Sequence, residues 1–547
     1  MTKVNKKFIF YILLFTFHVS LFTLNPDSAG FGVFAQQPTL EWVARFHNIP
    51  NSYSLSSDDL GNIFVSGAYY NYALNKTEFL TLKYNTYGIL QWYKLYNGPD
   101  TLTSGFTDIA LINIADGCGN VYVGGNSSNN LFGDDILVIK YNSFGNMVWL
   151  ARYQGKTNDL IAGMVKDKFG NIYVTGSGYG LPNTGKDYIT IKYDSSGNKL
   201  WERTYNNLFD SPDFAKAIAV DSSQNVYVTG YCINEYLFEE YVTIKYNNLG
   251  VQQWVSKYFS TYRNSEAVSI AVDLNGYIYV TGFVDYIYPG FENYLTIKYD
   301  SLGNSIWLAE FNSVFPAESI DIPYKILIDT SNNVYITGSS TVKYNELGVF
   351  QWADTISPGK YSSLDNTGKL YVTGQRADMS QYWWIETAKY GYNGNKEWTL
   401  LYGKRQDTIA WPSDILVDRN YDLYILGNVY VGGQQNTDSI LLFKYSQALG
   451  IISNYNQLPD RFFLAQNYPN PFNPNTVIFY DLPVSSNVNI TVYNITGREI
   501  ITLVNQKQNA GSYKIVFDGN GYSSGVYFYT LTIDGKIIDS KKMVLLR

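Results

Sequence analysis

A five-residue run of β-branched and aromatic residues that ends in glycine recurs eight times between residues 63 and 427 of this 547-residue chain. Its copies read IFVSG, VYVGG, IYVTG, VYVTG, IYVTG, VYITG, LYVTG and LYILG. A Lys-Tyr pair recurs in step with it and ends at Tyr84, Tyr141, Tyr193, Tyr246, Tyr299, Tyr344, Tyr390 and Tyr445. Tryptophans recur too, at positions 42, 92, 149, 201, 254, 307, 352 and 398. Repetition at this period limits the chain to folds that stack or close similar units.

The copy at residues 214–258 shows what one unit contains. Runs rich in Val, Ile, Thr and Tyr predict strands at Ala217–Asp221, Val226–Tyr231, Tyr241–Tyr246 and Gln252–Tyr258. Asp, Asn, Ser and Gly separate these runs, as hairpin turns require. Four strands in such a repeat are typical of one blade of a β-propeller. The sequence therefore predicts an all-β fold with an eight-bladed β-propeller, and seven blades are the alternative.

The two ends of the repeat array complement each other. A strand at Glu41–Phe46, which carries the first tryptophan, precedes the first glycine-ending run. The last repeat has no tryptophan strand after Tyr445. We expect the N-terminal strand to be the missing fourth strand of the last blade, because this pairing removes an open sheet edge. A local strand at Ile451–Tyr455 is the alternative.

Residues 1–35 have the features of an export signal. Three lysines precede the apolar segment Phe8–Leu24, and small residues end at Ala35, before an expected cut at Gln36. An uncleaved membrane anchor is the alternative, but the apolar segment is short for a span of about 20 residues. After cleavage we expect no stable transmembrane segment. Cleavage changes the formal net charge from −7 to −9. This acidic balance argues against nucleic acid as a partner.

A different composition begins after the repeats. Residues 36–447 form the expected propeller, 448–463 a polar linker, and 464–547 a separate domain. The last of these contains short alternating runs such as NVNITVYNITG and GVYFYTLTIDG. Six or seven short strands in about 80 residues predict a small Ig-like β-sandwich.

Several separated motifs in this last domain resemble a known family. The run at residues 469–474 is PNPFNP, Gly497 follows VYNIT, and a basic end follows GVY. Its key residues are Pro469, Asn470, Pro471, Phe472, Gly525 and Tyr527. They resemble the type A C-terminal sorting domain of the type IX secretion system. The resemblance implies that the type IX machinery is a partner. It also implies export through the periplasm and outer membrane of a Gram-negative bacterium, with the protein then secreted or held at the cell surface.

The repeats resemble the SBBP β-propeller repeat family over residues 40–447, and members of that family often have seven blades. One segment, YDSSGNKLW at residues 193–201, also resembles the tryptophan-docking repeat of eight-bladed quinoproteins. The chain lacks the adjacent cysteine pair found in many of those enzymes. We therefore predict no cofactor.

The direction of the strands sorts the connections onto two faces. One face carries short turns such as DLNG and NNLG, in which an Asp or Asn caps the turn and a later Gly takes positive φ. These turns lack the further oxygen ligands of a calcium loop, so no metal site is predicted. The other face carries long and varied loops. Because a feature present in one blade is a better candidate for a site than one shared by all, we look for a ligand on this second face.

Aromatic residues are concentrated in the variable loops, often beside acids. The candidate ligand-binding residues are Tyr69, Tyr70, Tyr231, Tyr236, Tyr286, Tyr288, Trp383, Trp384 and Trp411. Rings next to acids suit a glycan or a protein ligand. The alternative is that these rings fold back onto the blades.

Acids also recur near the start of the first strand of a blade. They are Asp108, Asp159, Asp213, Glu266 and Asp321. If that strand is innermost, these acids surround the mouth of the central channel and could bind a basic ligand. Alternatively, they cap the loops that join one blade to the next.

The sequence is poor in the residues of common hydrolases. His47 is the one histidine left after export, and the two cysteines, Cys118 and Cys232, occupy different positions in their repeats. The chain therefore has too few histidines and cysteines for the usual serine triads or zinc sites. We expect a binding protein with no catalytic residues. Carboxylate-dependent glycoside hydrolysis at the channel mouth and a structural role in the cell envelope are the alternatives.

Overall fold

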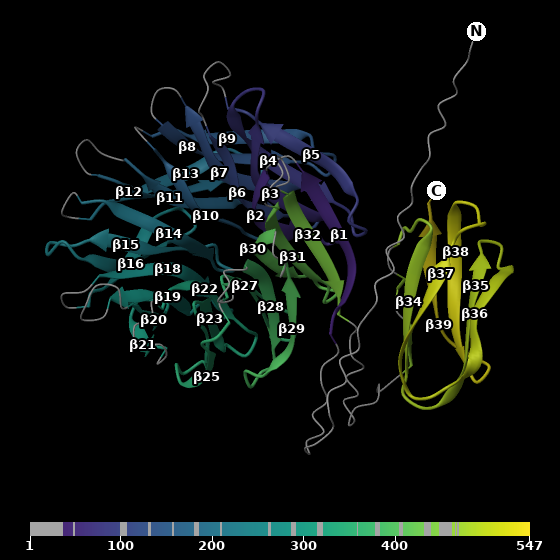
Figure 1. Cartoon of the computed structure of the whole chain (residues 1–547). Helices are drawn as coiled ribbons and strands as arrows, with labels where there is room; N and C mark the ends of the chain where they lie inside the picture. Colours follow the sequence, from purple (N-terminus) through teal and green to yellow (C-terminus); the bar gives the residue numbers. More distant parts are fainter. Residues whose placement is uncertain are drawn as a thin grey trace, which may run out of the picture. The chain divides into compact units, whose positions relative to one another are not determined.

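The computed structural model describes residues 37–546 except 48–49, 99–106, 130–132, 156–157, 180–184, 208–210, 261–263, 286–291, 314–320, 358, 378–382, 404–407, 432–438, 448–461, 465 and 468–469. The expected signal peptide at residues 1–35 therefore lies outside the described residues. All the regular structure in the described part is β-strand. Eight four-stranded antiparallel sheets follow one another between residues 39 and 446 (Figure 1). The prediction of an all-β propeller is confirmed.

Each sheet forms one blade, and its four strands follow one another in space as A, B, C and D. Blade 1 contains β2 (Pro50–Ser57), β3 (Ile63–Asn71), β4 (Lys76–Tyr84) and β5 (Leu90–Tyr96), and blade 2 contains β6 (Asp108–Ala115), β7 (Val121–Asn129), β8 (Gly133–Tyr141) and β9 (Met147–Tyr153). Blade 3 contains β10 (Leu160–Lys166), β11 (Ile172–Gly178), β12 (Asp187–Tyr193) and β13 (Lys199–Tyr205), and blade 4 contains β14 (Asp213–Val220), β15 (Val226–Ile233), β16 (Glu239–Tyr246) and β17 (Gln252–Tyr258).

Blades 5 to 7 repeat this order along the chain, and blade 8 takes its D strand from the N-terminus. Blade 5 contains β18 (Ser265–Val272), β19 (Ile278–Asp285), β20 (Glu292–Tyr299) and β21 (Ser305–Phe311), and blade 6 contains β22 (Pro323–Ile328), β23 (Val334–Gly338), β24 (Thr341–Tyr344) and β25 (Phe350–Asp354). Blade 7 contains β26 (Tyr361–Leu364), β27 (Leu370–Ala377), β28 (Trp383–Tyr390) and β29 (Lys396–Tyr402), and blade 8 contains β30 (Thr408–Val417), β31 (Leu423–Val431), β32 (Ser439–Ser446) and β1 (Thr39–His47).

The ring closes through its two chain ends. Strand β1 pairs antiparallel with β32, from Thr39 opposite Ser446 to His47 opposite Ser439. The prediction that the N-terminal strand completes the last blade is confirmed. The alternative strand at Ile451–Tyr455 lies outside the described residues.

The A strands start earlier than the sequence pattern predicts. In blade 4 the strand starts at Asp213 rather than Ala217, because the register shifts between Ala215 and Ala217 and the bulge breaks the alternation of apolar residues. The same bulge occurs in every described A–B strand pair except that of blade 7. It also explains the recurring glycine. A Cβ at Gly230 would lie 2.0 Å from the carbonyl oxygen of Phe214, so the bulged strand leaves no room for a side chain.

Neighbouring blades are joined by the recurring tryptophan and lysine. At the junction of blades 4 and 5, Trp254 Nε1 and Lys245 Nζ both donate to the carbonyl oxygen of Ser301, at 3.1 and 3.0 Å. The indole lies against the turn at Gly303, where a Cβ would meet the ring at 2.7 Å. The ammonium group of Lys245 also lies 5.3 Å from the ring centroid of Tyr227. These residues are therefore blade-to-blade contacts, as their presence in every repeat indicates.

Turns on the short-loop face use their aspartates as caps. Asp221 Oδ1 accepts hydrogen bonds from the backbone of Ser223 and Asn225, and its Oδ2 accepts from Asn225 Nδ2 and the hydroxyl of Tyr227. The carboxylate is thus occupied within its own hairpin, which is what the turn pattern predicts.

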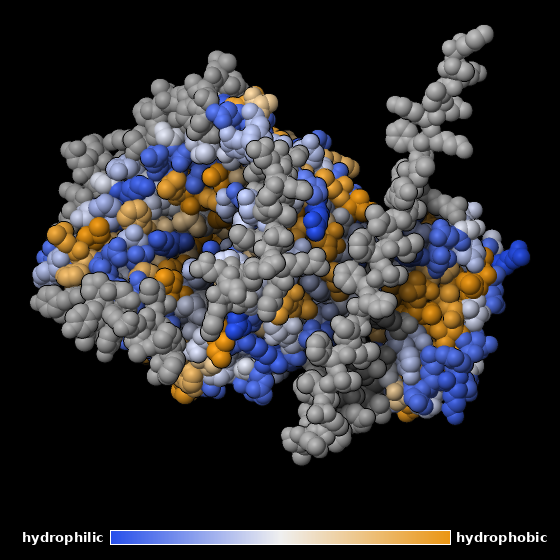
Figure 2. All heavy atoms as spheres, viewed as in Figure 1, coloured by the Kyte–Doolittle hydropathy of each residue, from blue (hydrophilic) through white to orange (hydrophobic). Residues whose placement is uncertain are grey.

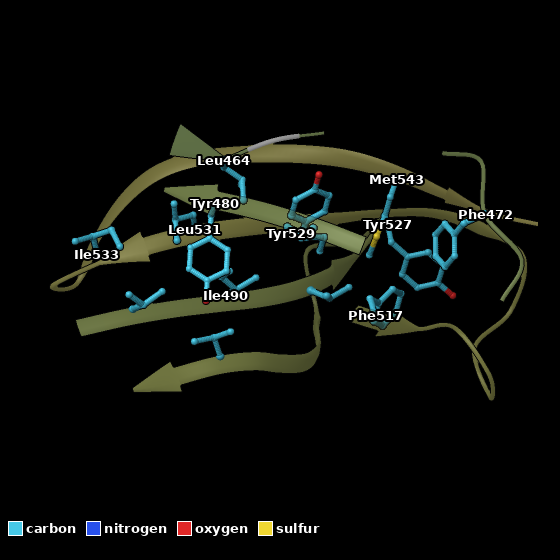
Figure 3. Close-up of a cluster of buried hydrophobic side chains, with 14 of the residues drawn as sticks. Leu464, Phe472, Tyr480, Ile490, Phe517, Tyr527, Tyr529, Leu531, Ile533 and Met543 are labelled. Carbon is cyan, nitrogen blue, oxygen red and sulfur yellow. The ribbon is translucent and has the colours of Figure 1, made fainter. Parts of the chain in front are cut away.

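The C-terminal domain contains two packed sheets. One holds β33 (Phe463–Leu464), β34 (Asn475–Leu482) and β37 (Gly511–Asp518), and the other holds β36 (Glu499–Gln508), β35 (Ser486–Asn494), β38 (Gly525–Ile533) and β39 (Lys536–Leu545). Their facing side chains form one buried core (Figure 3). In the part of the chain that the structure describes, no helix has the length and apolar character needed to cross a membrane.

Candidate functional site

A cavity of about 390 Å³ opens where blades 7, 8 and 1 meet. It is lined by Asn51, Ser52, Tyr53, Lys360, Tyr361, Gln375, Trp411, Pro412, Ser413 and Asn428. These residues come from the A strands of three blades and the B strands of two of them. Residues at opposite ends of the propeller sequence therefore meet in one pocket because the ring is closed.

The lining combines aromatic rings with neutral polar groups. Trp411, Tyr53 and Tyr361 supply the rings, and Asn51, Gln375 and two serines supply amides and hydroxyls. Tyr53 occupies the bulge of β2 and is 36% exposed. No carboxylate is among the lining residues that the structure describes. The pocket therefore offers apolar ring faces and uncharged hydrogen-bonding groups side by side.

A hydrogen-bond network fixes the wall of the pocket between blades 8 and 1. Asn428 Oδ1 accepts from the backbone N–H of Ser52 at 2.9 Å, and its Nδ2 donates to Ser413 Oγ at 2.6 Å. The hydroxyls of Ser52 and Ser413 lie 3.0 Å apart. Nearby, Asp414 Oδ2 accepts from the N–H of Leu55 at 2.8 Å. All these contacts join residues more than 350 positions apart, except the one within blade 8, so the wall is preorganised by ring closure.

Among the described lining residues of the pocket, Lys360 is the one cation. Lys360 Nζ lies 5.5 Å from the ring centroid of Tyr361 and 5.7 Å from that of Tyr324. Burial raises the pKa of Tyr361 to about 12, so its phenol stays neutral at physiological pH. Cation–π contacts therefore hold the exposed ammonium without neutralising it.

The predicted aromatic residues are not gathered in one place. Trp411 lines the pocket, whereas Trp383 is 40% exposed elsewhere on β28 and its neighbour Trp384 is buried. Tyr231 stacks on Phe214, Tyr236 stacks on Phe259, Tyr70 packs against Tyr72, and Tyr69 packs against a buried cluster. Tyr286 and Tyr288 lie outside the described residues. Sequence reasoning missed Tyr53 and Tyr361, which reach the pocket from A strands, and Lys360, which lies just before β26.

Four of the predicted acids hold blade-to-blade loops. In each case the carboxylate accepts a backbone N–H from the residue two positions after the preceding D strand. The pairs are Asp108 with Gly98 at 2.8 Å, Asp159 with Gly155 at 2.5 Å, Asp213 with Asn207 at 2.6 Å and Asp321 with Ser313 at 2.7 Å. All four are at most 3% exposed. We call this contact the loop latch.

Burial dominates the electrostatics of the loop latch. It raises the pKa of both Asp159 and Asp213 to about 6, and it also raises that of Asp108. Cys232 lies beside Asp213, and burial together with this carboxylate raises the pKa of its thiol. Cys232 is buried and Cys118 is exposed, and both are free.

Glu266 differs from the other four acids. It lies one residue further along its A strand and forms a side-chain hydrogen bond with Glu239, and its carboxylate lies 3.5 Å from Lys216 Nζ. Burial, followed by repulsion from Glu266, raises the pKa of Glu239 to about 7. Asp285 and Glu292 face each other across β19 and β20 in the same region, and burial raises the pKa of each. Among the described residues, no group of three or more acids, histidines or cysteines has the arrangement of a metal site.

The sorting-motif residues bind the chain end of the second domain. Asn470 Oδ1 accepts from Val544 N, and Phe472 exchanges backbone hydrogen bonds with Val544 and Leu546. Pro471 lies between them, and Phe472 packs on Phe517 in the core (Figure 3). Gly525 starts β38, in which Tyr527 donates its hydroxyl to the carbonyl of Ser523. Pro469 lies outside the described residues.

The surface of this domain is partly apolar. Figure 2 shows hydrophobic side chains gathered on the viewed face of the sandwich, with hydrophilic ones around them. Exposed apolar residues of the domain include Phe463, Ile501, Val516, Phe528 and Ile537. These residues come from both sheets of the sandwich.

Comparison with known proteins agrees with both resemblances. Residues 466–545 match the secretion system C-terminal sorting domain, and residues 307–345 match a β-propeller repeat, the SBBP type. A curated relative, an uncharacterised WD repeat-containing protein of Acanthamoeba polyphaga mimivirus, is 29% identical over 189 residues. The match covers 33% of this chain and 11% of the length of that protein.

Two solved structures are similar at low identity. PorZ, a bacterial surface component of the type IX secretion system of Porphyromonas gingivalis, is 12% identical with a TM-score of 0.33, over 91% of this chain and 82% of PorZ. The β-propeller domain of the trilobed protease from Pyrococcus furiosus is 11% identical with a TM-score of 0.39, over 73% of this chain and 94% of that domain.

Proposed function

We propose that this chain, a secreted or cell-surface protein delivered by type IX secretion in a Gram-negative bacterium, is a non-enzymatic binding protein for saccharides. The site is the pocket between blades 7, 8 and 1. The sorting domain supplies the contact with the secretion machinery, and the propeller supplies the ligand contact.

The composition of the pocket wall carries this proposal. Sugars present apolar C–H faces that pack on aromatic rings and hydroxyls that pair with amides. Trp411 and Tyr53 offer the rings, and Asn51 and Gln375 offer the amides. The wall is held by hydrogen bonds within the protein, so little ordering is required on binding.

Binding to the mature full-length chain is tested by glycan array and calorimetry. Replacing Trp411 by alanine should weaken saccharide binding about tenfold or more, because it removes the largest ring of the pocket. Trp383→Ala is the matched control, since Trp383 is a half-exposed tryptophan of blade 7 outside the pocket lining. Binding that is absent, or that is lost equally in both variants, would contradict the proposal.

A carboxylate-dependent hydrolase is the second candidate, and the Glu239–Glu266 pair favours it. Two carboxyls that share a hydrogen bond, with one pKa near 7, can supply an acid and a base. Hydrolysis of glycoside substrates should then fall by at least 100-fold in Glu239→Gln and be unaffected by Trp411→Ala. Equal activity in the parent chain and Glu239→Gln would exclude this site as catalytic.

We also propose the division of the chain. Cleavage after Ala35 removes the export signal, residues 36–447 form the propeller, 448–463 are the linker, and 464–547 form the sorting domain. The β1–β32 pairing and the sandwich core support these boundaries. Mass spectrometry of the exported protein should find Gln36 at its N-terminus.

A further inference from the structure

The pocket carries a positive charge, whereas the chain as a whole is negatively charged. The protein has 47 acidic and 40 basic residues. Among the described lining residues, however, the charged group at neutral pH is Lys360, and no carboxylate accompanies it. A local positive site in an acidic protein attracts an anion at short range.

Lys216 and Lys360 lie in similar places over tyrosine rings but differ in their charged partners. Both ammonium groups lie over tyrosine rings, Lys216 at 5.1 Å from Tyr231 and Lys360 at 5.5 Å from Tyr361. Lys216 is paired with Glu266 at 3.5 Å. Lys360 takes part in no ion pair within the part of the chain that the structure describes, and it is exposed. Its charge is therefore available to a ligand.

The groups around Lys360 do not compensate this charge. Asp414, the half-buried acid of the neighbouring strand β30, accepts from the N–H groups of Leu55 and Ile415. Burial raises the pKa of Asp414, and the charge of Lys325 on the adjacent blade opposes that shift, so the cation that faces this carboxylate is Lys325 rather than Lys360. Lys325 also donates to the carbonyl of Ser362.

Resting on the saccharide-binding function proposed above, we propose that this pocket selects acidic saccharides and that Lys360 determines this selectivity. The ammonium pairs with an anionic group on the sugar, a carboxylate or a sulfate, while Trp411 and Tyr53 contact the apolar face. A charge-assisted hydrogen bond of this kind is stronger than one to a neutral hydroxyl and weakens with salt.

The test uses the mature full-length chain and two matched pairs of probes in calorimetry. One pair is an oligogalacturonide and its fully methyl-esterified form, and the other is a sulfated galactan and its desulfated form. The parent protein should bind the acidic member of at least one pair about fivefold more tightly, and this preference should shrink as salt rises. The pair that shows the preference identifies the anionic group.

Three variants separate the roles of the residues. Lys360→Gln should abolish the preference, because affinity for the acidic member falls to that for the neutral member. Lys216→Gln, the control lysine on blade 4, should keep the preference. Trp411→Ala should weaken both members of a pair alike.

The outcomes distinguish this inference from the proposed function. Equal affinity for the acidic and neutral members, or a preference that survives in Lys360→Gln, overturns the role of Lys360 and leaves saccharide binding standing. A loss of affinity for both members in Lys360→Gln also overturns it, because the lysine would then only support the wall. Absence of binding to every saccharide overturns both proposals.

Discussion

Blades 1 to 6 and the pair formed by blades 7 and 8 are built from the same repeat but are joined to the next blade differently. In blades 1 to 6 a tryptophan and a lysine share one backbone carbonyl of the next blade, as at Ser143, Ser195 and Ser301. In the second group, which we call the seam sector, Lys389 donates to the side chain of Gln447, and Lys444 pairs with Glu41 and Asp422. The lysines of the seam sector therefore have side-chain acceptors, although Trp42 still donates to the backbone carbonyl of Thr86.

The loop latch is also distributed unevenly around the ring. It holds loops that lead into blades 2, 3, 4 and 6, through Asp108, Asp159, Asp213 and Asp321. The corresponding positions in blades 5, 8 and 1 are Ser265, Ala410 and Pro50, which have no carboxylate. The pocket opens where blade 7 meets blades 8 and 1, two neighbouring blades that lack this contact. A region freed from a repeated structural contact is available for a ligand.

The largest effect is expected from removing the closing strand. Deletion of residues 36–47 leaves β32 with an unpaired edge in the seam sector, and this edge is a template for association with other chains. We expect loss of cooperative unfolding and formation of oligomers. Light scattering and thermal unfolding measure both. Trp42→Ala, which keeps the strand, should remain a monomer, and a monomeric deletion variant with an unchanged melting temperature would contradict the closure argument.

Next in size is the loss of a repeated tryptophan. Trp254→Ala should lower the free energy of unfolding by about 3 kcal/mol, because it removes the indole packed on the turn at Gly303. Trp254→Phe keeps a ring and loses the hydrogen bond to Ser301, so its cost should be about 1 kcal/mol. Chemical denaturation measures the two. Similar costs for both variants would mean that the hydrogen bond rather than packing joins these blades.

A pair of lysines compares the two kinds of junction directly. Lys444 is buried between Glu41 and Asp422, so Lys444→Met leaves two partly buried carboxylates without their cation and should cost about 2 kcal/mol. Lys245→Met loses a cation–π contact and one hydrogen bond to a carbonyl, with an expected cost of about 1 kcal/mol. If the two costs were equal, the seam would not depend on its charges more than the regular junctions do.

The smallest effect concerns pH and the loop latch. The pKa of Asp159 and of Asp213 lies near 6 in the folded chain, above the ordinary 3.8, so folding favours their protonated forms. Their contribution to stability is complete below pH 3.8, is lost as pH rises through 6, and is then constant. After allowance for solvent screening, each should contribute about 1 kcal/mol.

Denaturation at pH 4.5 and 7.5 should therefore show a smaller pH dependence in the double variant D159N/D213N than in the parent. The control is Asp194. Hydrogen bonds from Asn198 hold the pKa of this carboxyl below its usual value. Asp194→Asn should leave the dependence between these two pH values nearly unchanged, because Asp194 ionises below about pH 4 in both the folded and the unfolded chain. An unchanged profile in the double variant would show that these carboxyls ionise normally.

The repeated parts of this molecule could be predicted from the sequence because every blade needs the same residue types at equivalent positions. The glycine-ending run, the Lys-Tyr pair and the tryptophan were correctly assigned to blade structure and blade junctions. The start of the A strand could not be predicted, since the bulge at Lys216 interrupts the alternation that marks a strand.

The pocket was predictable only in part. Trp411 stood out as a single aromatic residue in a long connection. Tyr53 and Tyr361 are two of 51 tyrosines and gain their role from a bulge and from ring closure, which no local pattern encodes. The role of Gln447 as a hydrogen-bond acceptor could not be predicted either, because its partners Lys389 and Tyr371 lie 58 and 76 residues away in the sequence.

The pairing of β1 with β32 also orders events in time. Ser439 Oγ lies 2.9 Å from His47 Nδ1, a contact across 392 positions of sequence. Such a long separation makes closure a late and slow step, because β1 has no permanent neighbour until the eighth blade has formed. Residues 466–545, which match the sorting domain, follow β32 in the chain. In synthesis order, the address is therefore complete only after every strand needed to seal the ring has been made.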